Sequence, residues 1–277
     1  MPQDFNQQII DEFRANQGQV AMFDGARLLL LTTTGARTGA SRTTPVGYLP
    51  DGGRVLIIAS AGGAPKHPAW YHNLLAEPRV KVEDGIFTYQ AEAVVLEGEE
   101  RDGAFARAVE MDPGWAAYQA KTSRVIPVVA LTPQFGAGPN PMRGGDTLVV
   151  VHNAFRRELR LIRKEVAASG TGGLGVQLRI NCLTLCQGLH HHHTKEDAEV
   201  FPGVEWRYPE LAPVMERLRA EHGTVARLLD ELQRLLADTE PEVAAGRVLA
   251  EVERLTAEVE AHLDYEESYL VPILNAY

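Results

Sequence analysis

Cysteine is nearly absent from this sequence, with two among 277 residues. Cys182 and Cys186 are about one helical turn apart, so we expect both to pack in a core rather than to form a disulfide. A disulfide framework is therefore excluded as the basis of the fold. Such sparse use of cysteine is typical of a reducing compartment, and a cytoplasmic location is expected.

Positive charge and long apolar runs are also scarce. The chain has 27 Lys and Arg against 37 Asp and Glu, a formal net charge of −10. An acidic chain without a basic run argues against a nucleic-acid partner and against an anionic membrane surface. No apolar stretch reaches the roughly 18 residues that span a bilayer, so no transmembrane segment is expected. The first residues, Met1 to Asp4, lack the basic and apolar regions of a signal peptide.

The sequence pattern of the first half of the chain predicts short β-strands. Candidate strands are 28–34, 44–48, 55–59, 80–82, 87–95 and 126–131. Tight-turn signals at 51–53 and 84–85 join neighbouring strands, so we expect an antiparallel sheet. Helices are expected at 3–16, covering a sheet edge or shaping a pocket mouth, and at 98–120 with a break at 113–114. No sustained alternation of strand and helix appears, so a Rossmann domain is not expected.

The second half of the chain has helical periodicity. The Gly- and Pro-rich segment 134–145 is predicted to be a linker. Four helices are predicted after it, at 147–168, 174–200, 209–237 and 241–270. Their spacing and short connections predict an up-down-up-down four-helix bundle. We therefore divide the chain into a β domain at 1–133, the linker, and a helical domain at 146–277.

A repeated histidine and glutamate pattern marks the helical domain. His192 and Glu196 are four residues apart, so on a helix they lie one turn apart on the same face. The same pair recurs as His262 and Glu266, and a lone histidine precedes each pair, at His152 and His222. The two lone histidines are 70 residues apart. The same separation relates His192 to His262 and Glu196 to Glu266. The register predicts a duplicated helix pair whose six polar side chains meet in the bundle core.

Imidazole and carboxylate ligands in a bundle suit iron, manganese or zinc. Two carboxylates that can bridge, together with four imidazoles, suit a pair of ions better than a single ion. The neighbouring His190, His191 and His193 are expected to point to other faces, where they would be exposed or would support the ligands rather than bind the metal. Glu267 is expected to face solvent.

These helices resemble the hemerythrin-like (HHE cation-binding) family over about 147–277. The resemblance rests on the order of the ligands and on Val200-Phe201-Pro202 and Leu270-Val271-Pro272, which follow the two pairs. It implies a non-haem di-iron centre in which Glu196 and Glu266 bridge the irons and the four histidines are terminal ligands. Oxygen-carrying hemerythrins have a second third-helix histidine where this chain has Ala226. That departure favours reactivity toward O₂, peroxide or nitric oxide over reversible O₂ carriage.

Two loops of the β domain combine small residues with positive charge. Residues 32–42 join two strands and contain Arg37 and Arg42, whose guanidinium groups suit phosphate or carboxylate groups. Residues 59–74 contain Lys66 and a Trp-Tyr pair that could wall a flat aromatic ligand. Taken alone, each loop is equally consistent with a solvated or packed turn.

Together the loops resemble the deazaflavin-dependent nitroreductase family, whose split β-barrel is of the flavin-reductase type. The resemblance covers about 20–133 and includes Gly98-Glu99-Glu100-Arg101, Tyr118-Gln119 and Arg124-Val125-Ile126-Pro127-Val128. It implies that coenzyme F420 binds here. Its acidic tail would contact Arg37, Arg42 and Lys66. Its ring would contact Pro45, Ala59, Ser60, Trp70 and Tyr118. Ser60 is the candidate catalytic hydrogen-bond donor, and Ala61 stands where some members have lysine.

The sequence thus predicts a multidomain α+β redox protein, a split barrel followed by a hemerythrin-like bundle. The first hypothesis is an F420-dependent oxidoreductase coupled to a di-iron domain that binds or reduces O₂, peroxide or nitric oxide. Quinones and nitro compounds are further candidate acceptors. The second hypothesis is a sensor or store of O₂, nitric oxide or iron whose barrel binds a cofactor without turnover. FMN or haem remain alternatives to F420, and the resemblance implies a homodimer through the barrel.

Overall fold

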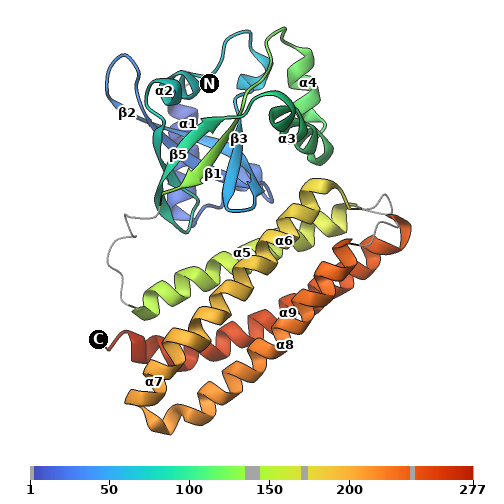
Figure 1. Cartoon of the computed structure of the whole chain (residues 1–277). Helices are drawn as coiled ribbons and strands as arrows, with labels where there is room; N and C mark the ends of the chain where they lie inside the picture. Colours follow the sequence, from blue (N-terminus) through green and yellow to red (C-terminus); the bar gives the residue numbers. More distant parts are fainter. Residues whose placement is uncertain (1–2, 135–143, 170–173, 238–240, 277) are drawn as a thin grey trace. The chain divides into compact units, whose positions relative to one another are not determined.

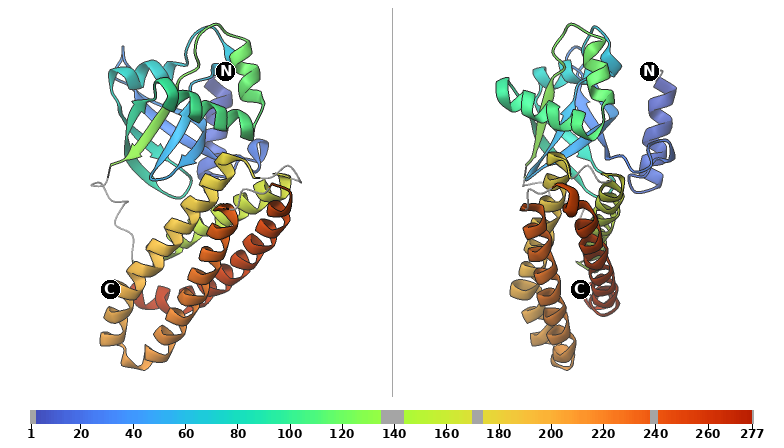
Figure 2. Two further views of the ribbon diagram at one scale, coloured as in Figure 1. Left: turned by 45° about the vertical axis from the view of Figure 1, so that its right-hand side comes forward. Right: turned by 90° about the vertical axis from the view of Figure 1, so that its right-hand side faces the viewer.

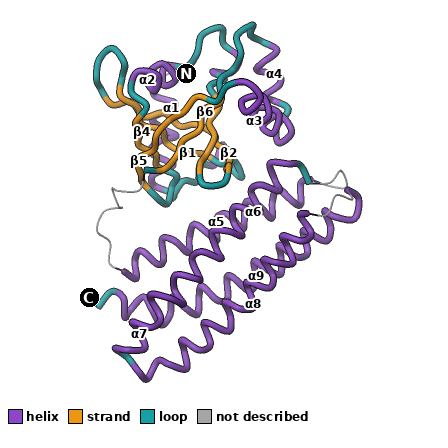
Figure 3. Tube along the Cα trace, in the orientation of Figure 1, coloured by secondary structure: helices purple, strands orange, loops and turns teal. Residues whose placement is uncertain are grey.

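The structure is a computed structural model that describes residues 3–134, 144–169, 174–237 and 241–276. It divides into two compact units, Met1–Pro141 with Gly175–Ile180, and Met142–Leu174 with Asn181–Tyr277. All strands of the described residues lie in the first unit, and the second is helical (Figures 1 and 3). The multidomain α+β fold class expected from the sequence is therefore confirmed.

Six antiparallel strands close the first unit into a barrel, in the order β1-β2-β3-β6-β5-β4. The strands are β1 (Leu28–Thr34), β2 (Ser41–Asp51), β3 (Arg54–Ile58), β4 (Arg79–Glu83), β5 (Thr88–Val95) and β6 (Val128–Pro133). A tight turn joins β2 to β3, where Asp51 pairs with Arg54. Gly52 in this turn has φ +66°, a conformation that favours glycine. Closure leaves no free sheet edge in the barrel.

Both faces of β1 are buried, which explains its four consecutive leucines. Leu29 and Leu31 belong to the barrel core. Leu28 and Leu30 pack against the helix α1 (Gln3–Ala15), which covers this side of the barrel. On β3, Ile57 belongs to the barrel core, whereas Leu56 and Ile58 pack with α3 (Gly98–Met111). The strands beneath helices therefore read as continuous apolar runs rather than as alternating patterns.

Two more helices of this unit lie beside the strands. Helix α4 (Gly114–Ala120) follows α3 after the break predicted at Pro113-Gly114. Helix α2 (Ala69–Ala76) was not predicted, because the sequence reads there as a ligand loop. Trp70 and Leu74 anchor α2 in the barrel core, so tertiary packing stabilises a helix that is only eight residues long.

The second unit is a bundle of long helices that run up and down beside one another (Figure 2). Its main helices are α5 (Gly144–Ser169), α6 (Val176–Lys195, of which the part from Asn181 belongs to this unit), α8 (Ala212–Ala237) and α9 (Pro241–Leu274). Between α6 and α8 the chain forms the short helix α7 (Phe201–Arg207) and then the 3-10 turn η5 (Pro209–Leu211). Helix α9 packs against α5 and α8. Gly145 permits a close approach between α5 and α9, since a Cβ atom there would lie 2.5 Å from the Val271 carbonyl oxygen.

A π-helical turn, Glu196–Val200, interrupts the second helix of the bundle between α6 and α7. The amide of Phe201 donates to the Glu196 carbonyl five residues earlier, which widens the turn by one residue. Pro202 follows at the start of α7. A proline has no amide hydrogen and crowds the carbonyl four residues before it, so the wider turn accommodates it within a continuous rod.

Most predicted helices agree with the structure to within a few residues at each end. The exception is the second helix of the bundle, which was expected to end at 200 but continues through Pro202 to Arg207. The predicted linker falls mainly on 135–143, which lie outside the described residues, while Gly144 and Gly145 already belong to α5. Among the described residues, no helix combines the length and the apolar character needed to cross a bilayer.

Candidate metal centre and cofactor pocket

The helices of the bundle direct polar side chains into one buried cluster. The predicted ligands are His152 on α5, His192 on α6, Glu196 in the π turn, His222 on α8, and His262 and Glu266 on α9. Five of these six residues are at most 4% exposed, and the His192 side chain is 13% exposed. The structure brings all six predicted side chains together.

The four imidazoles form two close pairs. The Nε2 atoms of His152 and His192 are 3.2 Å apart, and those of His222 and His262 are also 3.2 Å apart. Two nitrogens that each lie about 2.1 Å from one ion are about 3.0 to 3.4 Å apart at the usual angles. Each pair therefore has the separation expected of two ligands to a common ion.

The two carboxylates lie between these pairs. Glu196 places Oε1 3.2 Å from His192 Nε2 and Oε2 3.7 Å from His222 Nε2. Glu266 Oε2 is 3.4 Å from His152 Nε2 and 3.5 Å from His262 Nε2. Each glutamate thus reaches one imidazole of either pair. This is the placement of a carboxylate that bridges two ions.

The carboxylate oxygens provide a test of whether metal ions fit the cluster. All four oxygens of Glu196 and Glu266 are buried without a hydrogen-bond partner among the described residues. Buried carboxylates without partners carry a large desolvation penalty, which metal ligation removes. The residues present therefore fit a pair of metal ions, and Ala226 on α8 adds no ligand.

Three further carboxylates lie within hydrogen-bond distance of the Nδ1 atoms of three of these imidazoles. Glu267 Oε1 lies 2.9 Å from His152 Nδ1, Asp197 Oδ1 lies 2.9 Å from His222 Nδ1, and Glu221 Oε2 lies 3.0 Å from His262 Nδ1. Such contacts fix the ring orientation and the tautomer, leaving Nε2 free to bind an ion. The expectation that Glu267 faces solvent is wrong, since it bonds to His152 and, at 2.7 Å, to Arg156.

Sequence reasoning missed these three supporting acids, although a signal for two of them exists. Asp197 and Glu267 are separated by the same 70 residues as the ligands. Each directly follows a bridging glutamate, and each supports the lone histidine on another helix. Glu221 has no acidic counterpart, because the residue 70 positions earlier is Val151.

Burial shifts the titration of the whole cluster. It lowers the pKa of His152 to about 2, of His222 to about 3 and of His192 to about 4, with smaller contributions from neighbouring imidazoles. Burial raises the pKa of Glu196 to about 10, and the nearby Glu266 carboxylate adds to this. Burial likewise raises the pKa of Glu266 to about 8. The imidazoles are therefore neutral at neutral pH, which is the form that binds metals.

His193 does not point away from the cluster as expected. It is 5% exposed and stacks on His222, with ring centroids 4.1 Å apart and an interplanar angle of 10°. In the structure His192 contacts Phe155 and His152 of α5, whereas His193 contacts the histidines of α8 and α9. His190 and His191 are exposed, as expected.

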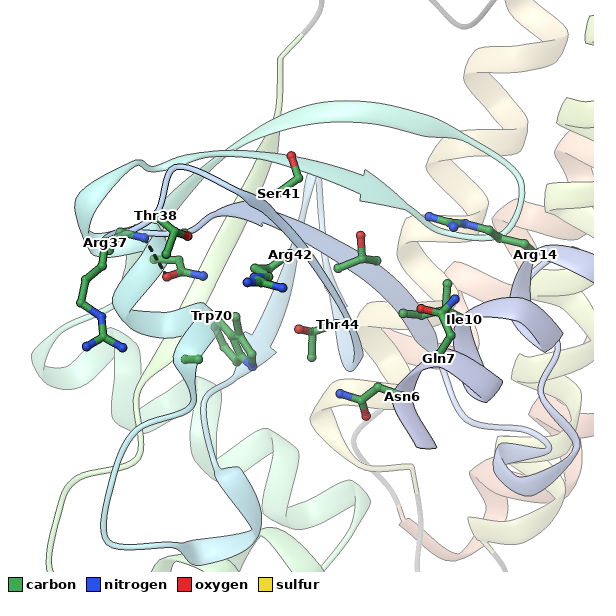
Figure 4. A pocket seen from close by; sticks show the side chains of 15 residues that line it. Asn6, Gln7, Ile10, Arg14, Arg37, Thr38, Ser41, Arg42, Thr44 and Trp70 are labelled. Atoms are coloured by element: carbon green, nitrogen blue, oxygen red, sulfur yellow. Dashed lines mark hydrogen bonds between the residues drawn. The ribbon is translucent and has the colours of Figure 1, made fainter. Parts of the chain in front are cut away.

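The barrel unit contains a separate pocket of about 550 Å³. Its lining comes from α1, the β1–β2 loop, β2 and α2, including Arg14, Arg37, Arg42, Trp70 and Asn73. Figure 4 shows Arg42 and Thr44 between Trp70 and the α1 residues, with the Arg37 side chain directed outward. Among the residues that the structure describes, three arginines and no carboxylate line the pocket, so it suits a ligand with phosphate or carboxylate groups.

The structure gathers only part of the predicted cofactor set at this pocket. Arg37, Arg42 and Trp70 line it, whereas Pro45, Ala59, Ser60, Lys66 and Tyr118 do not. Ala59 is fully buried in the barrel core, and Lys66 is exposed. Ser60 accepts from the Gly62 amide at 3.4 Å. Tyr118 packs with α3 and lies beneath the ammonium group of Lys121.

Two pocket features were not predicted. Asn73 on α2 accepts from the Ala36 amide at 3.1 Å and donates to Thr33 at 3.0 Å, which holds the arginine-bearing loop against the barrel. Helix α1 contributes Arg14, whose guanidinium is also paired with Glu83 at 2.8 Å. Helix α1 was expected either to cover a sheet edge or to shape a pocket mouth. It lines the pocket, but it packs on Leu28 and Leu30 of β1 in a barrel that has no free edge.

Comparisons with known proteins were made for both units. The profile of the F420H(2)-dependent quinone reductase family matches residues 6–133, and that of the hemerythrin HHE cation binding domain matches 143–274. An F420H(2)-dependent quinone reductase of Mycobacterium tuberculosis is 42% identical over 107 residues, which cover 38% of this chain and 72% of that protein. A putative F420H(2)-dependent quinone reductase of the same organism is 32% identical over 106 residues, covering 38% and 89%.

Among solved structures, an F420-H2 dependent reductase is 44% identical, covers 38% of this chain and 93% of its own, and has a TM-score of 0.36. The two family matches do not overlap, and the reductase match precedes the hemerythrin match along the chain. The chain belongs to the F420H(2)-dependent quinone reductase family and carries a hemerythrin HHE cation-binding domain after its reductase domain.

Proposed function

We propose that this protein is a two-domain redox enzyme, in which the barrel uses reduced F420 and the bundle holds two iron ions that bind or reduce a small oxidant. The observation that carries the proposal is the buried cluster in which two carboxylates without hydrogen-bond partners lie between two imidazole pairs. Family membership supports the cofactor of the barrel. O₂, peroxide and nitric oxide are the oxidants that fit an enclosed centre of this kind.

In the barrel, the chain's own residues would bind and orient the cofactor. Arg42 and Arg37 supply guanidinium forks for acidic groups, and Asn73 fixes the loop that carries Arg37. The buried Trp70 presents an aromatic wall to the same pocket. We retain Ser60 and Lys66 as candidate contacts outside the pocket lining, to be tested by substitution. Quinones are the acceptor class suggested by the relatives' names.

In the bundle, Glu196 and Glu266 would bridge the ions, and the four imidazoles would complete their ligand sets. Asp197, Glu221 and Glu267 hold three of the rings in position. Among the six predicted ligands, His192 has the most exposed side chain. We therefore propose that a small oxidant reaches the centre from this side. When bound, reduced F420 supplies a hydride equivalent and an iron pair supplies two one-electron sites, so the electron count of a coupled reaction balances.

Metal analysis and visible absorption of the untagged protein, before and after addition of reduced F420, test this proposal. We expect about two irons per chain and absorption that is bleached by the reduced cofactor and restored by air. Glu196→Ala should abolish iron binding while F420 binding persists, and Arg42→Ala should do the reverse. Two results would contradict the coupled reaction. One is a centre fully occupied by zinc, and the other is iron that stays oxidised in the presence of excess reduced F420.

A quinone reductase whose bundle takes no part in turnover is the second candidate. It is favoured by the match to the quinone reductase family, which ends at residue 133, before the bundle. Reduction of a soluble quinone by reduced F420 distinguishes the two candidates. An unchanged quinone rate in Glu196→Ala, together with no consumption of O₂, peroxide or nitric oxide by the parent protein, would favour separate activities.

A further inference from the structure

His193 is a fifth histidine of the buried cluster, and neither the repeat nor the proposed ligand set accounts for it. Its ring is stacked on His222 at 4.1 Å and lies edge-on to His262 at 5.1 Å. Ligand atoms of His193, His222 and His262 all lie within 4.8 Å of one another. His193 therefore shares the space of one imidazole pair, and it comes from the helix that supplies His192 to the other pair.

The Nε2 atom of His193 is buried and has no hydrogen-bond partner among the described residues. An imidazole nitrogen in this condition is costly unless a metal ion or a donor satisfies it. The exposed neighbours His190 and His191 show that the run of histidines does not by itself bury a ring here.

The 70-residue repeat shows that His193 breaks the symmetry of the centre. Every predicted ligand has a counterpart in the other helix pair, but the residue 70 positions after His193 is Leu263. Leu263 is fully buried, so the equivalent position near His152 offers only an aliphatic side chain. The His222 side of the centre consequently has three imidazoles, and the His152 side has two.

We propose that His193 is a ligand to the ion held by His222 and His262, so that the two ions of the centre are inequivalent. This inference rests on the metal centre of the proposed function. His193 supplies the imidazole that α8 lacks at Ala226, but from α6. One ion then has three imidazoles and the bridging carboxylates, and the other has two imidazoles and the same carboxylates. The open position for a small molecule lies on the ion of His152 and His192.

Metal titration of the metal-free protein with Co²⁺ alone tests the inference. The parent protein should bind two ions with different dissociation constants, measured by competition with a chelator. His193→Phe keeps an aromatic ring against His222 but removes the nitrogen. It should lower the affinity for the ion on the His222 side at least about tenfold. His190→Phe and His191→Phe make the same change at exposed positions and should leave both constants unchanged.

A count of bound imidazoles in the parent protein tests the ligand without any substitution. Each imidazole bound to Co²⁺ should give one hyperfine-shifted ring N–H resonance, identified by ¹⁵N-histidine labelling. We expect five such resonances. Four resonances, or a His193→Phe variant that keeps both parent constants, would show that His193 only packs in the core. A parent protein that binds no Co²⁺ would instead overturn the metal centre itself.

Discussion

At the scale of single residues, acidic side chains outside the candidate ligand set contact the candidate imidazole ligands. Asp197 and Glu267 each bond to the Nδ1 atom of a histidine on another helix. They orient the ring and make Nε2 a better electron donor. The centre is therefore built from pairs of a carboxylate and an imidazole that reach across the bundle.

Replacing these acids should weaken metal binding without removing a ligand. We expect Asp197→Asn and Glu267→Gln each to lower the affinity for the bound ions by about 10- to 100-fold. Competition with a metallochromic chelator measures the effect. Glu199→Gln, an exposed acid two residues after Asp197, is the matched control and should behave as the parent. Equal affinities in all the variants would mean that the Nδ1 contacts have no role in binding.

If Glu196 and Glu266 bridge the ions as proposed, metal binding should depend on pH. In the metal-free protein burial raises the pKa of Glu196 to about 10 and of Glu266 to about 8, so both are protonated at neutral pH. An ion must displace these protons, and binding therefore tightens as pH rises. We expect a gain of about tenfold per pH unit for each proton displaced, between about pH 6 and pH 8. Calorimetry in buffers of different ionisation enthalpy should detect at least about one released proton per centre. An affinity that does not depend on pH would contradict the raised pKa values of the two glutamates.

At the scale of elements, the π turn and the β1–β2 loop place the chemistry. The π turn carries Glu196 and places Phe201 beneath His222, with ring centroids 5.3 Å apart. In the barrel, the whole of β1 pairs with residues 41–47 of β2, and the last pair is Thr34 with Ser41. The loop between the two strands is therefore short, and its ends are held by this pairing. Asn73 of α2 holds that loop from the other side.

Arg42 at the start of β2 should contribute more to cofactor binding than Arg37. Arg42 lies over the pocket, whereas the Arg37 side chain is directed outward (Figure 4). We expect Arg42→Ala to raise the F420 dissociation constant about 10- to 100-fold, the range for a lost charged hydrogen bond. Arg37→Ala should have a smaller effect. Fluorescence titration measures both, and Arg79→Ala on β4, outside the pocket, is the control. A larger loss in Arg37→Ala would show that the acidic groups bind at the rim.

At the scale of the whole molecule, the chain consists of two units, each with its own buried core. Ligands that bind one unit should stabilise that unit alone. Metal ions at about 1,000 times their dissociation constant stabilise a folded site by about 4 kcal/mol. We expect calorimetry to show that chelation lowers the unfolding temperature of the bundle transition and leaves the barrel transition unchanged.

F420 should have the opposite effect in the same experiment, because the described residues that line its proposed pocket all belong to the barrel unit. It should raise the barrel transition and leave the bundle transition in place. The Glu196→Ala protein provides the control, since chelation should no longer move its bundle transition. A single transition that responds to both ligands would show that the two units unfold together.

The sequence by itself determined the features that depend on local periodicity. The i,i+4 spacing puts His192 with Glu196 and His262 with Glu266 on common faces, whatever surrounds the helices. The 70-residue repeat then predicted that the six candidate ligands meet in the bundle core. The turn glycines and apolar runs likewise predicted the antiparallel strands, because backbone conformation and alternation are short-range properties.

Only the tertiary structure decided what lies between the elements. The burial of His193 depends on how α6 packs against α8, and the contact of Glu221 with His262 depends on the approach of α8 to α9. Neither residue follows the repeat, so its sequence position carries no signal. The same holds for Arg14 of α1, which lines a pocket built mainly from β2 and α2. Side chains from different elements meet through packing, which local sequence does not encode.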